Sequence, residues 1–217
     1  MATRQFPGCP SPFANSNERV RSRRTRSLFS SLILVLSTFA AYGATMNKPD
    51  VKKNPNPKMR YEVTVEVNDA PGPFETIIGI ADYRVTNELC VPPTPVMGAR
   101  IVPEQRATIQ FERIHDNVFK GTVYADLYQD EDYFGKGTCH WALVAAGMDL
   151  THGKVTFSAS LFHDDLLSGK AVERFFATAS YERAAVQRID IGIPDRSQFK
   201  GNGGLFSITM KAVEKTP

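Results

Sequence analysis

The chain has 217 residues, of which 26 are Lys or Arg and 23 are Asp or Glu, and 42% are hydrophobic. Six of the basic residues and one acidic residue fall within residues 1–43, so the rest of the chain holds 20 basic and 22 acidic residues, about −2 net. Nucleic-acid-binding proteins concentrate positive charge to displace counterions from phosphates. The slightly acidic rest of the chain lacks this charge, so we do not expect a nucleic-acid partner.

Residues 17–44 have the pattern of an export signal. Five arginines between Arg19 and Arg26 precede an apolar stretch over residues 28–43. Its 16 residues suit a signal peptide and fall below the roughly 18 to 20 that a membrane-spanning helix needs. We therefore expect a periplasmic or secreted protein.

The leader has an expected cleavage site and two open points. Small residues at Ala41 and Gly43 predict cleavage before Ala44, which makes residues 1–43 the signal peptide. An uncleaved leader that stays in the membrane is the alternative, and membrane contact is expected only through this segment. Residues 1–17 contain three prolines and no signal-like pattern, so a later start, for instance at Val20, stays open.

The chain after the leader begins with a lead-in and two strands. Residues 44–58 are rich in Asn, Lys and Pro and predict a flexible lead-in to a single domain over residues 59–217. Apolar and polar residues alternate over residues 61–67, which predicts a strand with one buried face. A second strand is expected over residues 76–85, with Gly79 as a candidate bulge.

Two cysteines follow the leader, because Cys9 lies within it. Cys90 and Cys139 form an even pair, which in an oxidising compartment predicts a disulfide. Such a bond would close a loop of about 50 residues and stabilise the fold by roughly 4 kcal/mol. A reactive thiol is the alternative, although neither cysteine belongs to a C-x-x-C motif. The prolines of residues 90–95 cannot donate to a ladder, so this loop is expected at an edge or between sheets.

The rest of the chain shows hardly any helical periodicity. Further strands are expected over residues 107–114, 118–128, 141–150, 155–162, 172–181, 186–193 and 205–213. The first two form a hairpin around residues 115–117, and residues 163–169 predict one short helical turn. Eight or nine short strands predict an all-β fold, an antiparallel β-sandwich of Ig-like or related topology, with a barrel as the alternative.

The connection over residues 126–141 holds the densest group of charged and aromatic residues. The expected partner-binding residues are Asp130, Glu131, Asp132, Tyr133 and Phe134. The acids would meet basic groups of another protein, and the rings would supply anchor area. Asp130, Asp132 and Gly135 partly resemble a calcium loop, but the spacing does not fit D-x-[DN]-x-[DN]-G. No metal or other cofactor is expected, and cation binding by the acidic loop stays open as an alternative. The alternative is an acidic surface loop held by the disulfide.

Catalytic motifs are not apparent. The pair His163 and Asp164 is the best candidate for an acid–base group, although a capped helical turn explains the same residues. There is no G-x-S-x-G elbow, and no histidine pair has metal-ligand spacing. We assign no catalytic residue and favour a non-enzymatic protein. Phe175 and Phe176 are adjacent, so one ring must leave the core, either as an exposed anchor or beneath a covering helical turn.

The run D-E-D-Y-F-G-K-G-T-C-H-W at residues 130–141 resembles a pattern in small uncharacterised secreted proteins of Gram-negative bacteria. Some of these resemble proteins encoded near type VI secretion toxins, where periplasmic immunity proteins neutralise an incoming effector. The likeness covers mainly residues 118–167. It implies a non-enzymatic periplasmic protein that binds another protein, with toxin neutralisation as the most concrete form. A small-ligand carrier and a hydrolase using His163 and Asp164 are the alternatives.

Overall fold

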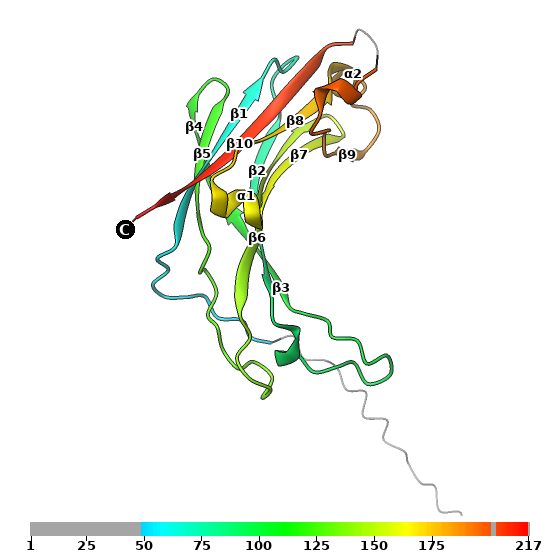
Figure 1. Ribbon diagram of the computed structural model, residues 1–217. Coiled ribbons are helices and arrows are strands. Elements are labelled where there is room, and N and C mark those ends of the chain that lie inside the picture. Colours follow the sequence, from blue (N-terminus) through cyan, green and yellow to red (C-terminus); the bar gives the residue numbers. More distant parts are fainter. Residues whose placement is uncertain (1–48, 201–202, 217) are drawn as a thin grey trace, which may run out of the picture. The chain divides into compact units, whose positions relative to one another are not determined.

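Two five-stranded sheets face each other in the computed structural model, which describes residues 49–200 and 203–216 (Figure 1). The first sheet has the order β4 (Phe111–His115), β5 (Val118–Tyr124), β1 (Arg60–Asn68), β10 (Leu205–Lys215) and β8 (Val172–Ala177). The second has the order β3 (Glu104–Ile109), β2 (Thr76–Val85), β6 (Trp141–His152), β7 (Val155–Phe162) and β9 (Arg188–Asp190). The predicted all-β sandwich is confirmed, with ten strands in the described residues.

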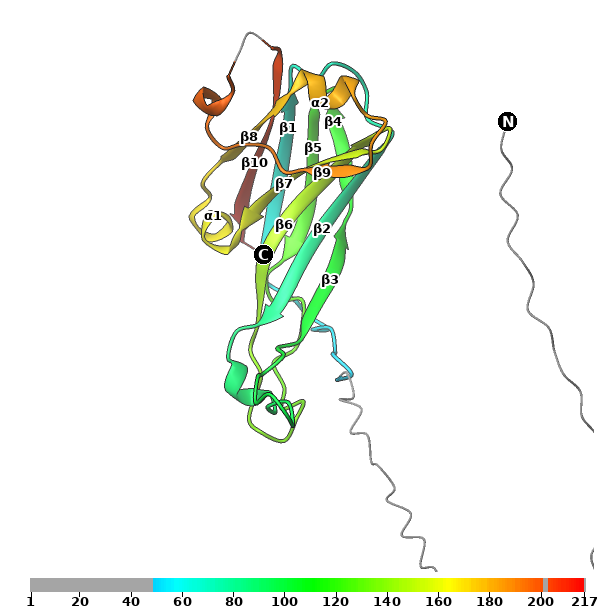
Figure 2. The same cartoon turned by 90° about the vertical axis from the view of Figure 1, so that its right-hand side faces the viewer.

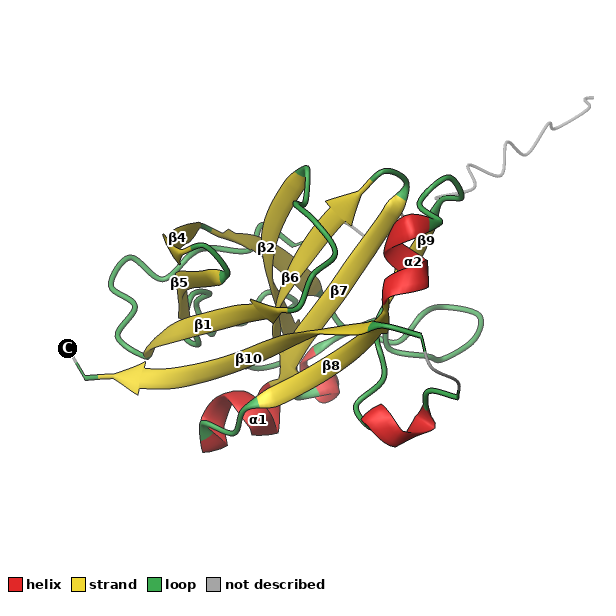
Figure 3. Cartoon of the chain, turned by 90° about the horizontal axis from the view of Figure 1, so that it is seen from above, coloured by secondary structure: helices red, strands yellow, loops and turns green. Residues whose placement is uncertain are grey.

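The two layers are separate when seen from above, with β1, β10 and β8 in one and β2, β6 and β7 in the other (Figure 3). Two short α-helices, α1 (His163–Ser168) and α2 (Thr178–Glu182), lie at the margins of these layers (Figure 3). Short 3-10 turns occupy Glu88–Cys90 and Arg196–Gln198. None of the helices in the described ranges has the length and apolar character needed to cross a membrane.

The core lies between the sheets and follows from alternation along the strands. In β1 the side chains of Tyr61, Val63, Val65 and Val67 are buried, while the residues between them face outward. The largest fully buried side chains are Tyr83, Phe157, Phe176, Phe206, Met148, Leu150, Leu161, Leu166, Ile208, Met210, Val63 and Val65. Burial of each such side chain contributes about 1.5 to 3 kcal/mol, which makes this layer the main source of stability.

One predicted strand, over residues 107–114, is two strands in the structure. The chain leaves one sheet for the other at Gln110, so β3 pairs with β2 while β4 pairs with β5. The candidate bulge at Gly79 is wrong, because the register of β2 and β6 shifts between Asp82 and Tyr83. Gly79 instead makes room for Phe111, since a Cβ at Gly79 would lie 2.6 Å from the Phe111 ring.

The C-terminal third also departs from the expected strands. The strand expected to reach residue 181 ends with β8 at Ala177, and α2 follows because the Tyr181 hydroxyl donates to the Pro73 carbonyl at 2.6 Å. β9 has three residues and pairs with β7 in parallel, so the sandwich is not purely antiparallel.

The expected helical turn is α1, which ends at Gly169 with φ 65°. Phe176 is fully buried, and Phe175 is half-buried, so its ring is not a free anchor.

The lead-in expected to be flexible is attached to the domain over its second half. The Asp126 carboxylate accepts the backbone N–H groups of Lys58 and Met59 at 2.8 and 3.0 Å. The N–H of Asn54 donates to the Leu127 carbonyl at 2.8 Å. These bonds fix residues 54–59 beside the start of the acidic loop. The expected signal peptide, residues 1–43, and its cleavage site lie outside the described residues.

Candidate functional site

A disulfide joins two long loops at one end of the sandwich (Figure 2). It links Cys90 and Cys139, whose Cα atoms are 5.3 Å apart, and confirms the predicted pairing. One loop, residues 86–103, connects β2 to β3, and the other, residues 125–140, connects β5 to β6. We call these two loops together the disulfide tip. Both cysteines are buried, so the bond lies inside the tip rather than on its surface.

Polar groups align the two loops beside the disulfide. The Asn87 side chain donates from Nδ2 to the Thr138 carbonyl at 2.7 Å and accepts the His140 N–H at Oδ1, also at 2.7 Å. The N–H of Thr86 donates to the His140 carbonyl at 2.9 Å. One amide side chain thus bridges the loops where the β2–β6 ladder ends, and the tip has a defined shape without further sheet.

The β2–β3 loop is also closed on itself. The Thr94 N–H donates to the Ala99 carbonyl at 2.8 Å, and the Gly98 N–H returns to the Thr94 carbonyl at 3.0 Å. Gly98 has φ 67°, a left-handed conformation that glycine adopts without steric cost. The Arg100 guanidinium donates to the Val91 carbonyl. The residues between Thr94 and Gly98 are therefore presented on a closed turn.

That turn exposes large apolar side chains. Val96 is 95% exposed and Met97 is 85% exposed at its apex, while Leu89 and Ile101 in the same loop are 73% and 64% exposed. Exposed apolar surface marks interaction sites, and four large exposed apolar side chains belong to this one loop. The sequence did not lead us to expect a contact surface here, because the prolines of this loop indicate only that it is not a strand. The signal that could have identified it is a run of apolar residues, Val91, Val96, Met97 and Ile101, in a segment that is not a strand and so has no alternating buried face.

The three predicted acids all have partners within the protein. The Asp130 carboxylate accepts the Trp141 N–H at 2.8 Å and lies 2.7 Å from the His140 Nδ1. The Glu131 carboxylate is 2.9 Å from the Lys52 ammonium. These contacts hold the acidic loop against β6 and the lead-in, and they leave the Asp130 side chain 45% exposed.

Asp132 organises the turn that follows. Its carboxylate accepts the N–H of Lys136 at 2.9 Å and that of Phe134 at 3.3 Å. These backbone hydrogen bonds, the one from Lys136 first, lower the pKa of the Asp132 carboxyl. Asp132 therefore keeps its negative charge at an exposed position of the tip.

The two predicted aromatic anchors support the loop from below. The Tyr133 hydroxyl donates to the Gln129 carbonyl at 2.6 Å, and its ring packs edge-on against Trp141 with 6.5 Å between centroids. Phe134 is half-buried against the core. Only part of each ring faces solvent, so most of the exposed apolar surface of the tip belongs to the other loop.

The alternative acid–base pair is not brought together in a cavity. The His163 Nδ1 lies 2.9 Å from the Leu143 carbonyl, and His163 borders a hollow of about 550 Å³ next to Asp130 and Trp141. Asp164 does not line this hollow and is exposed on the first turn of α1. No group of His, Cys, Asp and Glu in the described residues has an arrangement that could hold a metal ion.

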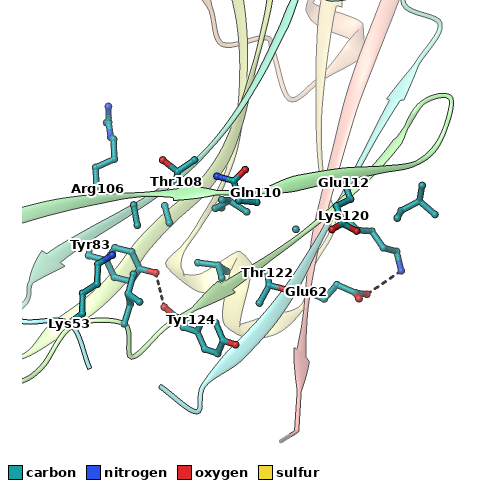
Figure 4. A pocket seen from close by; sticks show the side chains of 17 residues that line it. Lys53, Glu62, Tyr83, Arg106, Thr108, Gln110, Glu112, Lys120, Thr122 and Tyr124 are labelled. Carbon is teal, nitrogen blue, oxygen red and sulfur yellow. Dashed lines mark hydrogen bonds and ion pairs between the residues drawn. The ribbon is translucent and has the colours of Figure 1, made fainter. Parts of the chain in front are cut away.

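A second hollow, of about 890 Å³, opens between β3 and β5 (Figure 4). The side chains at its rim include Arg106 and Thr108 on β3 and Thr122 and Tyr124 on β5. Tyr83 crosses its floor and donates from the hydroxyl to the Tyr124 carbonyl at 2.7 Å. Burial raises the pKa of the Tyr83 phenol well above its usual range. The hollow is open to solvent along the seam between the sheets, unlike the enclosed cavity that a small-ligand carrier needs.

No protein-family model matches the chain, and neither a curated protein nor a solved structure matches it. The function proposed below therefore depends on the residues and geometry of the disulfide tip.

Proposed function

We propose that this protein works outside the cytoplasm as a non-enzymatic binding protein that contacts another protein through the disulfide tip. Neutralisation of an incoming protein toxin is the most concrete form of this proposal. The observation that supports it is the group of exposed apolar side chains, Leu89, Val96, Met97 and Ile101, on a loop that a disulfide and internal hydrogen bonds hold in place. The disulfide itself favours an oxidising compartment.

The tip has the physical properties of a preorganised contact surface. Apolar side chains on a fixed loop lose little conformational entropy on binding, so more of the contact energy becomes affinity. Large side chains such as Met97 can fill a pocket on a partner and act as anchors. Glu88, Asp130 and Asp132 are exposed on the same two loops and add a negative rim. The partner we expect is a protein with an apolar pocket and basic groups around it, because complementary charge speeds association.

The proposal is tested with a paired set of variants. The exported protein is purified from the periplasm with any protein that co-purifies in a fixed ratio, and the affinity is then measured with both components pure. Val96→Asp combined with Met97→Asp should weaken binding at least tenfold, because both anchors are replaced by charged groups. Ile189→Asp, at a residue on β9 that is 72% exposed, is the matched control and should leave the affinity within twofold. Equal affinities for the two variants would contradict the role of the tip.

Toxin neutralisation needs a separate readout. Cells that produce the partner in the periplasm should stop growing, and co-production of the wild-type protein should restore growth. The Val96→Asp, Met97→Asp variant should accumulate normally and fail to protect. A partner that binds through the tip but does not harm cells would contradict toxin neutralisation and would leave the proposal of protein binding unaffected.

The acidic rim makes its own prediction. Charge reversal at Asp130 and Asp132 should slow association with the partner and flatten its dependence on salt, because steering by the rim is lost. The unfolding midpoint of the variant serves as a control, since both carboxylates also accept backbone hydrogen bonds. An on-rate that does not respond to ionic strength in the wild-type protein would show that the rim has no steering role.

A further inference from the structure

The sulfur-containing side chains differ widely in exposure. Met148 and Met210 are 0% and 1% exposed in the core, and both tip cysteines are buried in their disulfide. Met59 is 45% exposed, whereas Met97 is 85% exposed on the closed turn of the disulfide tip. Within residues 49–200 and 203–216, Met97 is therefore the sulfur-containing residue that solvent reaches most easily.

The closed turn keeps Met97 at the surface. The Thr94 N–H donates to the Ala99 carbonyl, and the Gly98 N–H donates to the Thr94 carbonyl, so both sides of Met97 are attached to the same turn. Met97 could move into the interior only if these hydrogen bonds opened. Its thioether is therefore accessible to small oxidants in solution, and accessibility controls how fast a methionine is oxidised.

Met97 also differs in chemistry from the other exposed apolar residues of its loop. Leu89, Val96 and Ile101 have saturated hydrocarbon side chains, which do not react with peroxide. The thioether of methionine does react, and its product is a sulfoxide. Oxidation thus replaces a flexible apolar group by a polar one, which no longer suits an apolar pocket on a partner. One of the four exposed apolar side chains of this loop can therefore be changed by an oxidant.

We propose that Met97 is an oxidation switch on the disulfide tip, and that its conversion to the sulfoxide by a peroxide releases the protein partner. The sulfur lone pair attacks one oxygen of hydrogen peroxide, an S–O bond forms as the O–O bond breaks, and the second oxygen leaves as water. Sulfur loses two electrons, and peroxide gains them. A thiol-dependent methionine sulfoxide reductase reverses the change with two electrons and two protons. Release of the partner rests on the proposed function, whereas selective oxidation of Met97 does not.

The position of Met97 allows its oxidation without damage to the fold. At Met148 or Met210 a sulfoxide would place a polar group among buried side chains and destabilise the sandwich. At Met97 the side chain faces solvent, so the added oxygen is hydrated in the folded protein and disturbs no packing. The contact surface can therefore change while both sheets stay folded, which a reversible switch requires.

Peptide mass spectrometry tests the selectivity of the oxidation. The purified exported protein is treated with hydrogen peroxide for increasing times, and the gain of oxygen is measured for each methionine. Met97 should be oxidised about twofold or more faster than Met59, in the order of their exposure, and Met148 and Met210 should stay unchanged. Met46, which lies outside the described residues, is followed in its own peptide. The thermal unfolding midpoint should not change when only Met97 is oxidised.

Affinity for the co-purifying protein tests the switch. The treated protein is separated from peroxide before the two are mixed. The oxidised wild type should bind about tenfold more weakly than the untreated protein, because a polar group replaces an anchor. Met97→Leu retains an apolar side chain without a thioether, so peroxide should not change its affinity. Met59→Leu is the matched control and should lose affinity on oxidation as the wild type does. Methionine sulfoxide reductase should restore the affinity of the oxidised wild type.

The possible outcomes separate the switch from the proposed function. Oxidation of Met59 before Met97, or unfolding as Met97 gains its oxygen, would overturn the switch. An equal loss of affinity in the treated wild type and the treated Met97→Leu variant would also overturn it, because another residue would then be responsible. If the oxidised wild type keeps its affinity while Val96→Asp with Met97→Asp loses it, the tip binds the partner without a switch at Met97. If both keep their affinity, the proposed function is wrong as well.

Discussion

The sandwich body and the disulfide tip are stabilised in different ways. In the body, Phe157, Phe176 and Phe206 meet with ring centroids 5.1 to 5.6 Å apart and are almost completely buried. In the tip, Val96 and Met97 face solvent, and a disulfide with a few backbone and side-chain hydrogen bonds holds the loops. The body thus buries its apolar residues for stability, whereas the tip keeps its shape through the disulfide and hydrogen bonds and leaves apolar residues exposed.

The largest expected effect is in the body. Phe157→Ala should lower the free energy of unfolding by about 3 to 5 kcal/mol, because it removes a fully buried ring and leaves a cavity between the sheets. Denaturant unfolding followed by fluorescence measures this change. Ser158→Ala, at the adjacent half-buried residue of β7, is the control and should cost far less. A loss below about 1 kcal/mol for Phe157→Ala would mean that the core relaxes around the gap and is not the main source of stability.

Removal of the disulfide should have the next largest effect. Replacement of both Cys90 and Cys139 by Ser removes a covalent bond between residues 49 positions apart. This change should lower the free energy of unfolding by about 2 to 4 kcal/mol. The strands should stay folded, while limited proteolysis should cut faster within residues 91–99. Circular dichroism tests the strands, and mass spectrometry of the fragments locates the cuts. Cleavage first within β6 or β7 would show that the disulfide stabilises the body and not the tip alone.

Tyr83 tests the seam between the sheets. Tyr83→Phe should cost about 1 to 2 kcal/mol, because the Tyr124 carbonyl loses its buried donor. Burial raises the pKa of the phenol in the folded protein, while the unfolded phenol ionises near a pKa of roughly 10. Stability from this group is therefore full below that pH and decreases as the pH rises above it. Denaturant unfolding at increasing pH should show a steeper alkaline loss in the wild type than in Tyr83→Phe, and equal slopes would contradict the role of Tyr83.

The smallest expected effect is at Asp132. Backbone hydrogen bonds lower the pKa of the Asp132 carboxyl in the folded protein. The contribution of this group to folding stability is therefore fully present above the unfolded pKa of roughly 3.9. This stability is lost as the pH falls through the lower pKa of the folded state. Carbon NMR of the Asp132 carboxyl group should show a midpoint below the roughly 3.9 of Asp in an unstructured peptide. An ordinary midpoint for Asp132 would mean that the turn around residues 132–136 is open in solution.

The sequence predicts best where local pattern and burial agree. The alternation from Tyr61 to Val67 locates β1, and the two cysteines after the leader identify the disulfide. The split at Gln110 could not be predicted, because it depends on Gly79 and Gly121 giving space to side chains from the crossing strand. The helix α2 follows from the distant contact of Tyr181 with Pro73, which outweighs local strand preference.

The tip shows the same limit for the site. The acidic residues were recognisable as charges, but the sequence does not show that the Asp132 carboxylate accepts hydrogen bonds from backbone N–H groups of its own turn. It also does not show that Tyr133 faces Trp141 rather than solvent. Exposure of Val96 and Met97 depends on how residues 94–99 close, which is a property of the folded loop.

The most direct test is photo-crosslinking in cells that export the protein. A photoreactive phenylalanine analogue replaces Met97 in one variant and Ile189 in the other. The preorganised tip predicts a discrete cross-linked protein at position 97, its loss when Val96→Asp is added, and no such product at position 189. The same cross-linked pattern at both positions, or no cross-linked product at position 97 in cells that also produce the partner, would contradict the central role of the disulfide tip.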